Sequence, residues 1–213
     1  MNFPKKQLFI CFFSKGFYTK GMKKIKSARN TIAPKQQRAH DSKETILHIA
    51  TKIFAEKGLY GARIDAIADA AKVNKQRIYA YFGSKHDLYR QALLTVYAKA
   101  AENPKITALC EADIPNMTQI LLETFFEFHQ NNPLFWRLLV WEHLNGGKSL
   151  SEQDWQNIQS SYIDHLRTLY GKGQQKKLFQ KDVQFEIYLL LIFSISFFYY
   201  SNQITISHLL NLN

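Results

Sequence analysis

Residues 74–85 bring together side chains of the types that bind nucleic acid, in the order NKQRIYAYFGSK. Arg and Gln can form paired hydrogen bonds with base edges in the major groove, whereas Lys and Tyr hydroxyls suit phosphate oxygens. If Ile78 and Phe82 turn inward at i and i+4 of a helix, the outward residues are Lys75, Gln76, Arg77, Tyr79 and Tyr81. This stretch predicts a helix that reads DNA, and the alternative is an ordinary solvated helix face.

The elements around this helix are predicted to be helical as well. A first helix runs from Asp41, which has capping spacing with Glu44, to about Lys57, just before Gly58. A second, shorter pattern stops near Lys72. Its inward positions are Ile64, Ile67, Ala68 and Ala71.

Capping residues also place the third and fourth helices. Asn74 opens the third helix, and Ser84 with Asp87 opens a fourth that buries Leu88, Ala92, Leu93 and Val96. The turn between the second and third helices, residues 71–74, is short enough for a helix-turn-helix motif at about residues 65–84.

Positive charge is concentrated at the start of the chain. The formal charge of +11 divides into +10 over residues 1–43, +3 over residues 44–90 and −2 over residues 91–213. Such an imbalance favours a polyanionic partner for the N-terminal part, although a merely solvated tail gives the same count. Residues 1–40 are predicted to be a basic arm without regular structure. Residues 1–21 resemble a signal peptide only poorly, and we expect translation to start naturally at Met22.

Residues 45–94 resemble the DNA-binding domain of the tetracycline-repressor (TetR) family. The landmarks are Ile46, Ala50, the FAEKG segment at 54–58, Ile67 and Ala68, Val73, the run Tyr79-x-Tyr81-Phe82, and Ser84 with Lys85. The resemblance implies that Lys75, Gln76 and Arg77 meet base edges and backbone. It also implies that Tyr79, Tyr81 and Lys85 meet phosphates, and Asn74 is placed in the same DNA-binding set.

One departure from the family pattern lies before the second helix. The family usually has Thr or Ser there, whereas this sequence has Ala62 and Arg63, so a hydroxyl cap worth about 1 kcal/mol is lost. We predict that Arg63 adds a phosphate contact instead.

The second half of the chain, residues 97–213, is predicted to be all helical. Helices are expected from Asn116 to Gln130, from Pro133 to Leu144, from Ser151 to Tyr170, and from Asp182 onward. Residues 133–150 resemble the effector domain of some TetR-family proteins, which implies a small-molecule effector bound in a helical pocket. Trp136, Trp141 and Tyr162 are the candidate pocket residues, the alternative being ordinary core packing.

Residues 187–207 carry no charge, and the resemblance implies that the last two helices form a homodimer interface. A membrane anchor is the alternative, but Asn202, Gln203 and several serines interrupt the apolar run. Related proteins usually continue through one further helix after this point, so the last helix of the interface is expected to be missing or the interface to be smaller.

No enzyme motif is found. The sequence contains no nucleophile elbow, no GxGxxG and no phosphate-binding loop, and Cys11 and Cys110 lie outside any zinc spacing. The histidines form no ligand cluster, so no metal and no cofactor are expected. A reducing cytoplasm fits the two separated cysteines, and no membrane partner is expected.

The sequence therefore predicts an all-α protein. A three-helix helix-turn-helix domain at residues 41–96 is joined through its fourth helix to a helical effector and dimerisation domain at 97–213. The predicted function is a transcriptional regulator that binds double-stranded operator DNA as a repressor and is released by an effector. The alternatives are a truncated or nonspecific DNA-binding protein of the same fold and a membrane-anchored interaction protein.

Overall fold

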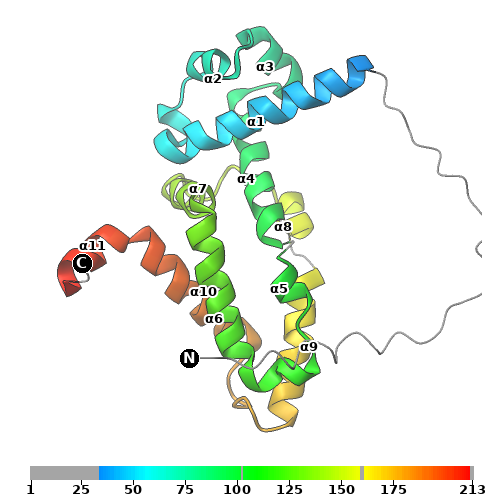
Figure 1. Cartoon of the computed structure of the whole chain (residues 1–213), viewed down its shortest axis with the longest axis vertical. Coiled ribbons are helices and arrows are strands. Elements are labelled where there is room, and N and C mark those ends of the chain that lie inside the picture. Colours follow the sequence, from blue (N-terminus) through cyan, green and yellow to red (C-terminus); the bar gives the residue numbers. More distant parts are fainter. Residues whose placement is uncertain (1–33, 102, 159–160, 212–213) are drawn as a thin grey trace, which may run out of the picture.

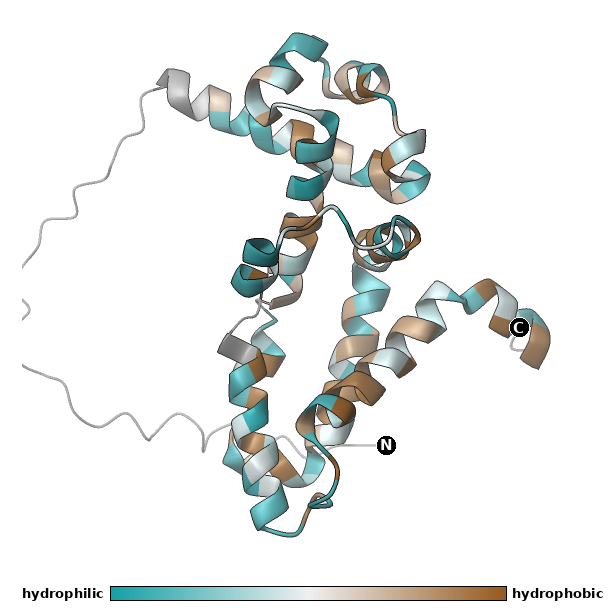
Figure 2. Ribbon diagram, turned by 180° about the vertical axis from the view of Figure 1, so that it is seen from behind, coloured by the Kyte–Doolittle hydropathy of each residue, from teal (hydrophilic) through white to brown (hydrophobic). Residues whose placement is uncertain are grey.

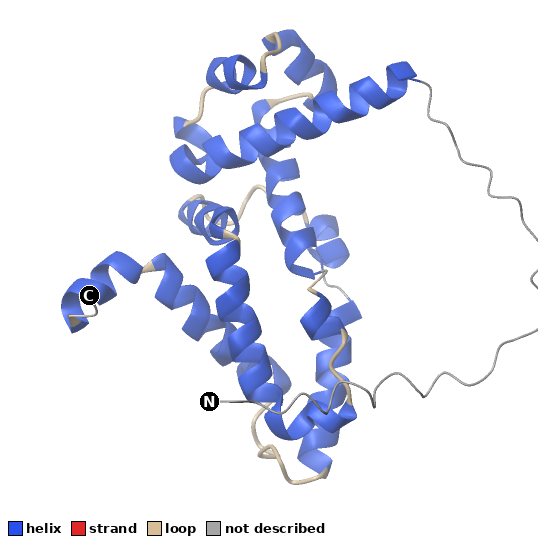
Figure 3. Ribbon diagram, in the orientation of Figure 1, coloured by secondary structure: helices blue, strands red, loops and turns tan. Residues whose placement is uncertain are grey.

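The structure is a computed structural model that describes residues 34–101, 103–158 and 161–211, without the side chains of residues 34–38 and 161–162. Every regular element within these ranges is a helix, which confirms the predicted all-α class (Figure 3). Most of the predicted basic arm, including Met22, lies outside the described residues.

Three helices form a head at one end of the molecule (Figure 1). They are α1 (Pro34–Gly61), α2 (Ile64–Ala71) and α3 (Lys75–Phe82), and α4 (Lys85–Ala101) leads from the head into the rest of the chain. The head has a continuous apolar core because each helix turns its periodic apolar face inward. Its fully buried members include Ile46, Ala50, Phe54, Ile67, Leu88 and Leu93.

The first helix is longer than predicted. It begins at Pro34 rather than Asp41, so Asp41 and Glu44 lie inside it and do not form its cap. Proline suits the first turn of a helix because the N–H that it lacks has no intrahelical acceptor there. None of residues 35–40 is Gly or Pro, so nothing in the sequence interrupts the helix before the apolar pattern begins.

Gly58 marks the predicted end of the regular part of α1. Its φ of +67° lies in the left-handed region that glycine adopts without steric cost, and it kinks the helix before the last turn. The Trp141 side chain packs against this kink, and a Cβ built on Gly58 would lie 2.7 Å from the Trp141 ring. Helix α7 (Pro133–Leu144) therefore packs directly against α1 of the head.

Apart from the core of the head, against which its residues Leu138 and Trp155 pack, the body has a second apolar core that includes Leu121, Leu166 and Ile192. The elements of the body are α5 (Pro104–Thr107), the 3-10 helix η1 (Glu111–Asn116), α6 (Met117–Asn131), α7, α8 (Glu152–Ile158) and α9 (Ser161–Gln175). The predicted boundaries of α6 and α7 hold to within one residue. Within the range of the helix predicted from Ser151 to Tyr170 the structure describes two helices, of which α8 packs on α4 and α9 packs on η1 and α5.

The last two described helices form an apolar arm that projects from the body (Figure 2). They are α10 (Phe185–Ser201) and α11 (Gln203–Leu210), bent by 83° relative to each other. The start predicted at Asp182 is wrong by three residues. The carbonyl of Val183 accepts hydrogen bonds from the Tyr170 hydroxyl at 3.0 Å and from Gln174 Nε2 at 2.9 Å, which ties this segment to α9 before the helix begins.

Candidate nucleic-acid interface and effector cavity

Helices α2 and α3 form a compact helix-turn-helix. Lys72 ends α2 in a left-handed conformation, and the Val73 amide donates to the Ala68 carbonyl at 3.0 Å. Asn74 then caps α3, since its Oδ1 accepts a hydrogen bond from the Arg77 amide at 2.9 Å. The Asn74 cap agrees with the predicted capping pattern, and these local hydrogen bonds hold the short turn between the two helices.

The outer face of α3 is the predicted DNA-reading surface. Ile78 and Phe82 are buried in the head, so the helix turns its polar face to solvent. The exposed residues on it are Lys75, Gln76, Arg77 and Tyr79. Tyr81 is half-buried with its ring against Phe82 at 6.4 Å between centroids, so only part of it faces outward. The exposed positions agree with the prediction, and the DNA contacts themselves stay predictions.

Two members of the predicted set also have partners inside the protein. Lys75 Nζ lies 3.2 Å from Asp65 Oδ1 of α2, so a phosphate would compete with this exposed ion pair. The Asn74 oxygen is occupied by its capping bond, which leaves only its amide nitrogen to donate to DNA. The main role of the Asn74 side chain in this structure is therefore to cap α3.

Lys85 and Arg63 flank the recognition helix. The Ser84 hydroxyl accepts from the Asp87 amide at 3.0 Å and caps α4. Lys85 in the first turn donates to the Tyr60 carbonyl at 3.4 Å, and partial burial lowers the pKa of Lys85. Arg63 is the residue before α2 and makes no side-chain cap, as the departure from the family pattern predicts, and it is exposed.

Sequence reasoning missed further side chains on this surface. The Tyr60 ring is 76% exposed beside His86, at 6.4 Å between ring centroids, where the end of α1 meets the start of α4. Lys43 of α1 lies 5.4 Å over the Phe82 ring at the end of α3. An exposed aromatic residue between Gly58 and Gly61 was the available signal for Tyr60, whereas the position of Lys43 depends on how the helices cross.

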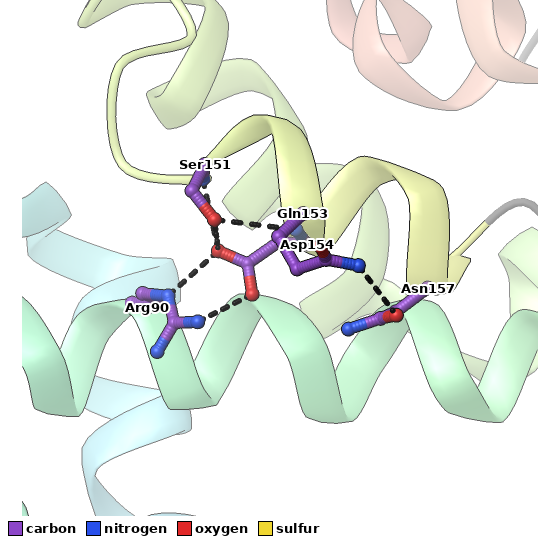
Figure 4. A network of polar contacts seen from close by, with 5 residues as sticks. All are labelled: Arg90, Ser151, Gln153, Asp154 and Asn157. Atoms are coloured by element: carbon purple, nitrogen blue, oxygen red, sulfur yellow. Dashed lines mark hydrogen bonds and ion pairs between the residues drawn. The ribbon is translucent and has the colours of Figure 1, made fainter.

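An ion pair connects the head to the body through α4 (Figure 4). Arg90 of α4 donates to both carboxylate oxygens of Asp154 on α8, with 2.7 Å between Arg90 Nε and Asp154 Oδ2. The Ser151 amide and hydroxyl donate to the same Oδ2 at 2.9 and 2.7 Å. The Arg90 guanidinium and these Ser151 bonds hold the pKa of the buried Asp154 carboxyl well below its usual range.

A second polar contact lies where α4 crosses α7. Glu142 is buried and accepts from the Ser149 amide at 2.7 Å, while its other oxygen and the Tyr89 hydroxyl are buried without a hydrogen-bond partner. Burial, with Glu142 nearby, raises the pKa of Tyr97 to about 12 and also raises that of Tyr89. The rings of Tyr89 and Phe54 of α1 pack edge to face, with 5.0 Å between their centroids.

Below this junction the body holds a cavity of about 570 Å³ that is partly open to solvent. Its wall is largely aromatic and aliphatic, and Arg167, Glu186 and Asn103 are its polar members. The aromatic lining comes from Tyr97, Phe125, Phe128, Phe135, Trp155, Phe185 and Phe193.

The tryptophans predicted to line a pocket lie elsewhere. Trp136 borders a separate, smaller hollow, and Trp141 packs on Gly58. The side chain of Tyr162 lies outside the described residues. Trp155 is the tryptophan that does reach the cavity, with its ring 5.5 Å from that of Tyr97.

The arm formed by α10 and α11 exposes an apolar stripe. Ile187, Leu191, Ile195 and Phe198 are each about half exposed and follow one another at helical spacing. No single described helix is long and apolar enough to cross a membrane. Helices α10 and α11 together have the length and apolar composition of a membrane span, but they are sharply bent relative to each other. Within the described ranges, no three acidic, His or Cys side chains lie close enough to hold a metal ion.

Known proteins match both parts of the chain. Residues 46–92 match the family described as "Bacterial regulatory proteins, tetR family", and residues 116–213 match "Tetracyclin repressor-like, C-terminal domain". The HTH-type transcriptional repressor NicS of Pseudomonas putida is 31% identical over 175 residues, which is 82% of each protein. The HTH-type transcriptional repressor SCO4008 of Streptomyces coelicolor is 33% identical over 106 residues, 50% of this chain and 52% of that protein.

Solved structures share the fold. SCO4942 of Streptomyces coelicolor aligns with a TM-score of 0.61 and 26% identity, covering 78% of this chain and 84% of that one. The TetR family regulator PfmR of Thermus thermophilus aligns with a TM-score of 0.56 and 23% identity, covering 73% and 83%.

A helix-turn-helix with a polar outer helix, joined by one helix to an all-helical body, defines a DNA-binding transcriptional regulator. The similarity to NicS extends over both the head and the body. The chain belongs to the tetR family of bacterial regulatory proteins.

Proposed function

We propose that this regulator is a repressor that binds operator DNA as a homodimer and is released when a small apolar effector enters the body. The observation that carries the DNA-binding part is the outer face of α3, where Gln76 and Arg77 stand exposed on a helix fixed at both ends. Residues 61–85 hold five Lys or Arg against Asp65 and Asp69, a net charge of +3 toward a phosphate backbone. The names of NicS and SCO4008 support repression over activation.

A second copy of the chain is the proposed occupant of the apolar stripe on α10. Two recognition helices related by a twofold axis read two half-sites of a near-palindrome, which one copy alone cannot do. Exposed Leu209 and Leu210 on α11 extend the apolar surface beyond the stripe. We expect Ile195→Glu to give a monomer in sedimentation at micromolar concentration, while Leu144→Glu, at an exposed position on α7, stays dimeric. A monomeric wild type would refute the dimer.

The aromatic cavity of about 570 Å³ is the proposed effector site, because the larger hollow of about 780 Å³ beside α1 is bordered by the charged residues Glu44, Lys52, Glu56 and Lys99. Its volume falls within the range of about 300 to 1,000 Å³ that small-molecule sites occupy, and its lining is mostly apolar. An effector there would contact Tyr97 on α4 and Trp155 on α8, the two helices that the Arg90 and Asp154 pair connects. We infer that the protein acts by binding rather than by catalysis, in the cytoplasm.

The decisive experiment measures binding of the full-length protein to its own upstream DNA and to a scrambled duplex, by fluorescence anisotropy at 150 mM NaCl. Arg77→Ala should weaken binding to the upstream fragment by roughly 1 to 3 kcal/mol and reduce the preference over scrambled DNA. Lys181→Ala removes an equal charge from the loop before α10 and serves as the matched control. Equal affinity for both duplexes would leave a nonspecific DNA-binding protein as the function.

A further inference from the structure

A surface with no assigned role lies where the end of α1 meets the start of α4. Tyr60 stands there between Gly58 and Gly61, and its ring is 76% exposed. The other exposed large hydrophobic side chain in the described part of the head is Tyr79, which lies on the recognition helix α3. Tyrosine combines an apolar ring with a hydroxyl that can donate a hydrogen bond, and it is enriched where proteins bind a partner. Tyr60 is therefore a candidate contact residue outside the predicted DNA-reading set.

The position of Tyr60 relative to α3 is fixed by α4. Lys85 Nζ donates to the Tyr60 carbonyl at 3.4 Å, and the His86 ring lies edge-on to the Tyr60 ring, with 6.4 Å between their centroids. Lys85 and His86 begin α4, which follows α3 after only two residues. We call Tyr60, Arg63, Lys85 and His86 together the Tyr60 surface. It is joined to the recognition helix on both sides, through α2 and through the start of α4, so it continues the predicted DNA-reading surface.

The Tyr60 surface carries positive charge that is not neutralised within the protein. No carboxylate of the described residues lies at ion-pair distance from Arg63 or Lys85, because the acidic residues nearest to them in the sequence are engaged elsewhere. Asp65 pairs with a lysine of α3 at 3.2 Å, and Asp87 accepts from the Ser84 hydroxyl at 2.6 Å. Unmatched positive charge beside an exposed hydroxyl donor suits the phosphate oxygens of DNA.

We propose that the Tyr60 surface binds the phosphate backbone beside the major groove that α3 enters, an inference that rests on the proposed DNA-reading role of α3. In a helix-turn-helix the first helix crosses the backbone while the second lies in the groove, and Arg63 directly precedes that first helix, α2. The new assignments are the Tyr60 hydroxyl, which donates to a phosphate oxygen, and His86, a positioning residue that holds the Tyr60 ring. A phosphate contact carries no sequence information, so the Tyr60 surface adds affinity without narrowing the choice of operator.

The test compares full-length variants on the upstream duplex and on a scrambled duplex, by fluorescence anisotropy at 150 mM NaCl. Tyr60→Phe removes one hydroxyl and should raise the dissociation constant about five- to tenfold on both duplexes, because a hydrogen bond to a charged oxygen is lost. The preference for the upstream duplex should not change, in contrast to Arg77→Ala. Tyr188→Phe is the matched control, because it removes a hydroxyl that faces Thr118 in the body, and it should bind as the wild type does. His86→Ala should weaken binding as Tyr60→Phe does, whereas His86→Phe keeps a ring beside Tyr60 and should bind as tightly as the wild type.

Single methylphosphonate substitutions in the upstream duplex identify the phosphate that Tyr60 contacts. On the duplex that lacks the charge of that phosphate, Tyr60→Phe should cost less than about twofold, because the hydroxyl has already lost its partner. An undiminished penalty at every substituted phosphate would overturn the proposal, as would full affinity of Tyr60→Phe on both duplexes. A loss confined to the upstream duplex would make Tyr60 a base-reading residue and also overturn it, and His86→Phe as weak as His86→Ala would overturn the positioning role. A wild type that binds the two duplexes equally would refute sequence-specific repression, whereas the comparison of Tyr60→Phe with the wild type would still decide this inference.

Discussion

Replacing Arg90 by Met tests whether the contact between α4 and α8 stabilises the protein as its geometry implies. Asp154 is 3% exposed at its side chain and accepts four hydrogen bonds, two from Arg90 and two from Ser151. The substitution leaves a buried carboxylate with only the two Ser151 bonds. Stranding one member of a buried pair costs about 3 to 5 kcal/mol, and because the Arg90 side chain is 36% exposed we expect the lower end, about 3 kcal/mol.

The matched control is an exposed pair in the same protein. Lys105 of α5 pairs with Glu127 of α6, and both side chains are more than half exposed. Lys105→Met should therefore cost less than about 1 kcal/mol. The double variant Arg90→Met with Asp154→Asn removes both charges, and it should be more stable than Arg90→Met alone because no unpaired carboxylate remains buried.

The assay is urea denaturation followed by circular dichroism at pH 7, with all variants at one protein concentration because a dimer's stability depends on concentration. The folded-state pKa of Asp154 is depressed, so the contribution of the pair is fully present above the ordinary carboxyl pKa and is lost as the pH falls below it. The difference between wild type and Arg90→Met should shrink accordingly in acid. A cost below 1 kcal/mol at pH 7, or a double variant as unstable as the sum of the singles, would refute the reasoning.

Two further predictions concern residues that the fold holds in unusual settings. His129→Phe should raise the free energy of unfolding at pH 7, because an apolar ring replaces a buried imidazole whose two nitrogens have no hydrogen-bond partner. Between pH 7.5 and pH 5 the free energy of unfolding of the wild type should fall by about 2 kcal/mol, whereas that of the variant should not. The reason is that histidine takes up a proton near pH 6.5 in the unfolded chain but only near pH 4 in the folded protein. Urea titrations at the two pH values measure both effects, and identical pH dependence would show that the imidazole is hydrated. Gly58→Ala should cost about 2 kcal/mol, because alanine is strained at a φ of +67° and its Cβ would displace the Trp141 ring, whereas Gly61→Ala meets only Lys57 Cβ at 3.5 Å and should be neutral or stabilising by melting temperature.

The helix-turn-helix could be predicted because its signals are local. Asn74 and Ser84 cap the helices on which they were identified, and the inward positions of Ile78 and Phe82 follow from helical spacing alone. The start of α1 was misplaced because Pro34 opens a helix as readily as it interrupts one.

The cavity could not be predicted because its lining comes from segments far apart in the sequence. Three tryptophans lie within twenty residues of one another on α7 and α8, and the sequence around them does not indicate which of them faces a cavity. Trp141 packs on Gly58, Trp136 borders the smaller hollow, and only Trp155 reaches the aromatic cavity. Which face of a helix meets a cavity depends on helix crossing, and that depends on packing of the whole chain.

Helix α4 is the element that connects the cavity to the recognition surface. Tyr97 lines the cavity, Arg90 holds α8, and Tyr89 packs on Phe54 in the core of the head. Eight residues of helix separate Tyr97 from Tyr89, a distance of about 12 Å over which a packed helix moves as a unit. Because α3 is joined to α4 by only two residues, we expect a ligand that displaces Tyr97 to displace the recognition helix as well.

Such a switch would need a ligand that binds the two states with different affinity and a junction that transmits the change. Reversing a 99:1 equilibrium takes about 5.5 kcal/mol of differential binding. If the contacts of α4 with α8 were weaker, they would break before the head moved, and the effector would fill the cavity without releasing DNA. The pair between Arg90 and Asp154, with an expected contribution of about 3 kcal/mol to folding, does not count toward that differential binding, but it holds α4 against α8. Tyr89 also packs on Phe54, and Trp141 packs on Gly58, so we expect the head and the body to respond to a ligand as one coupled unit.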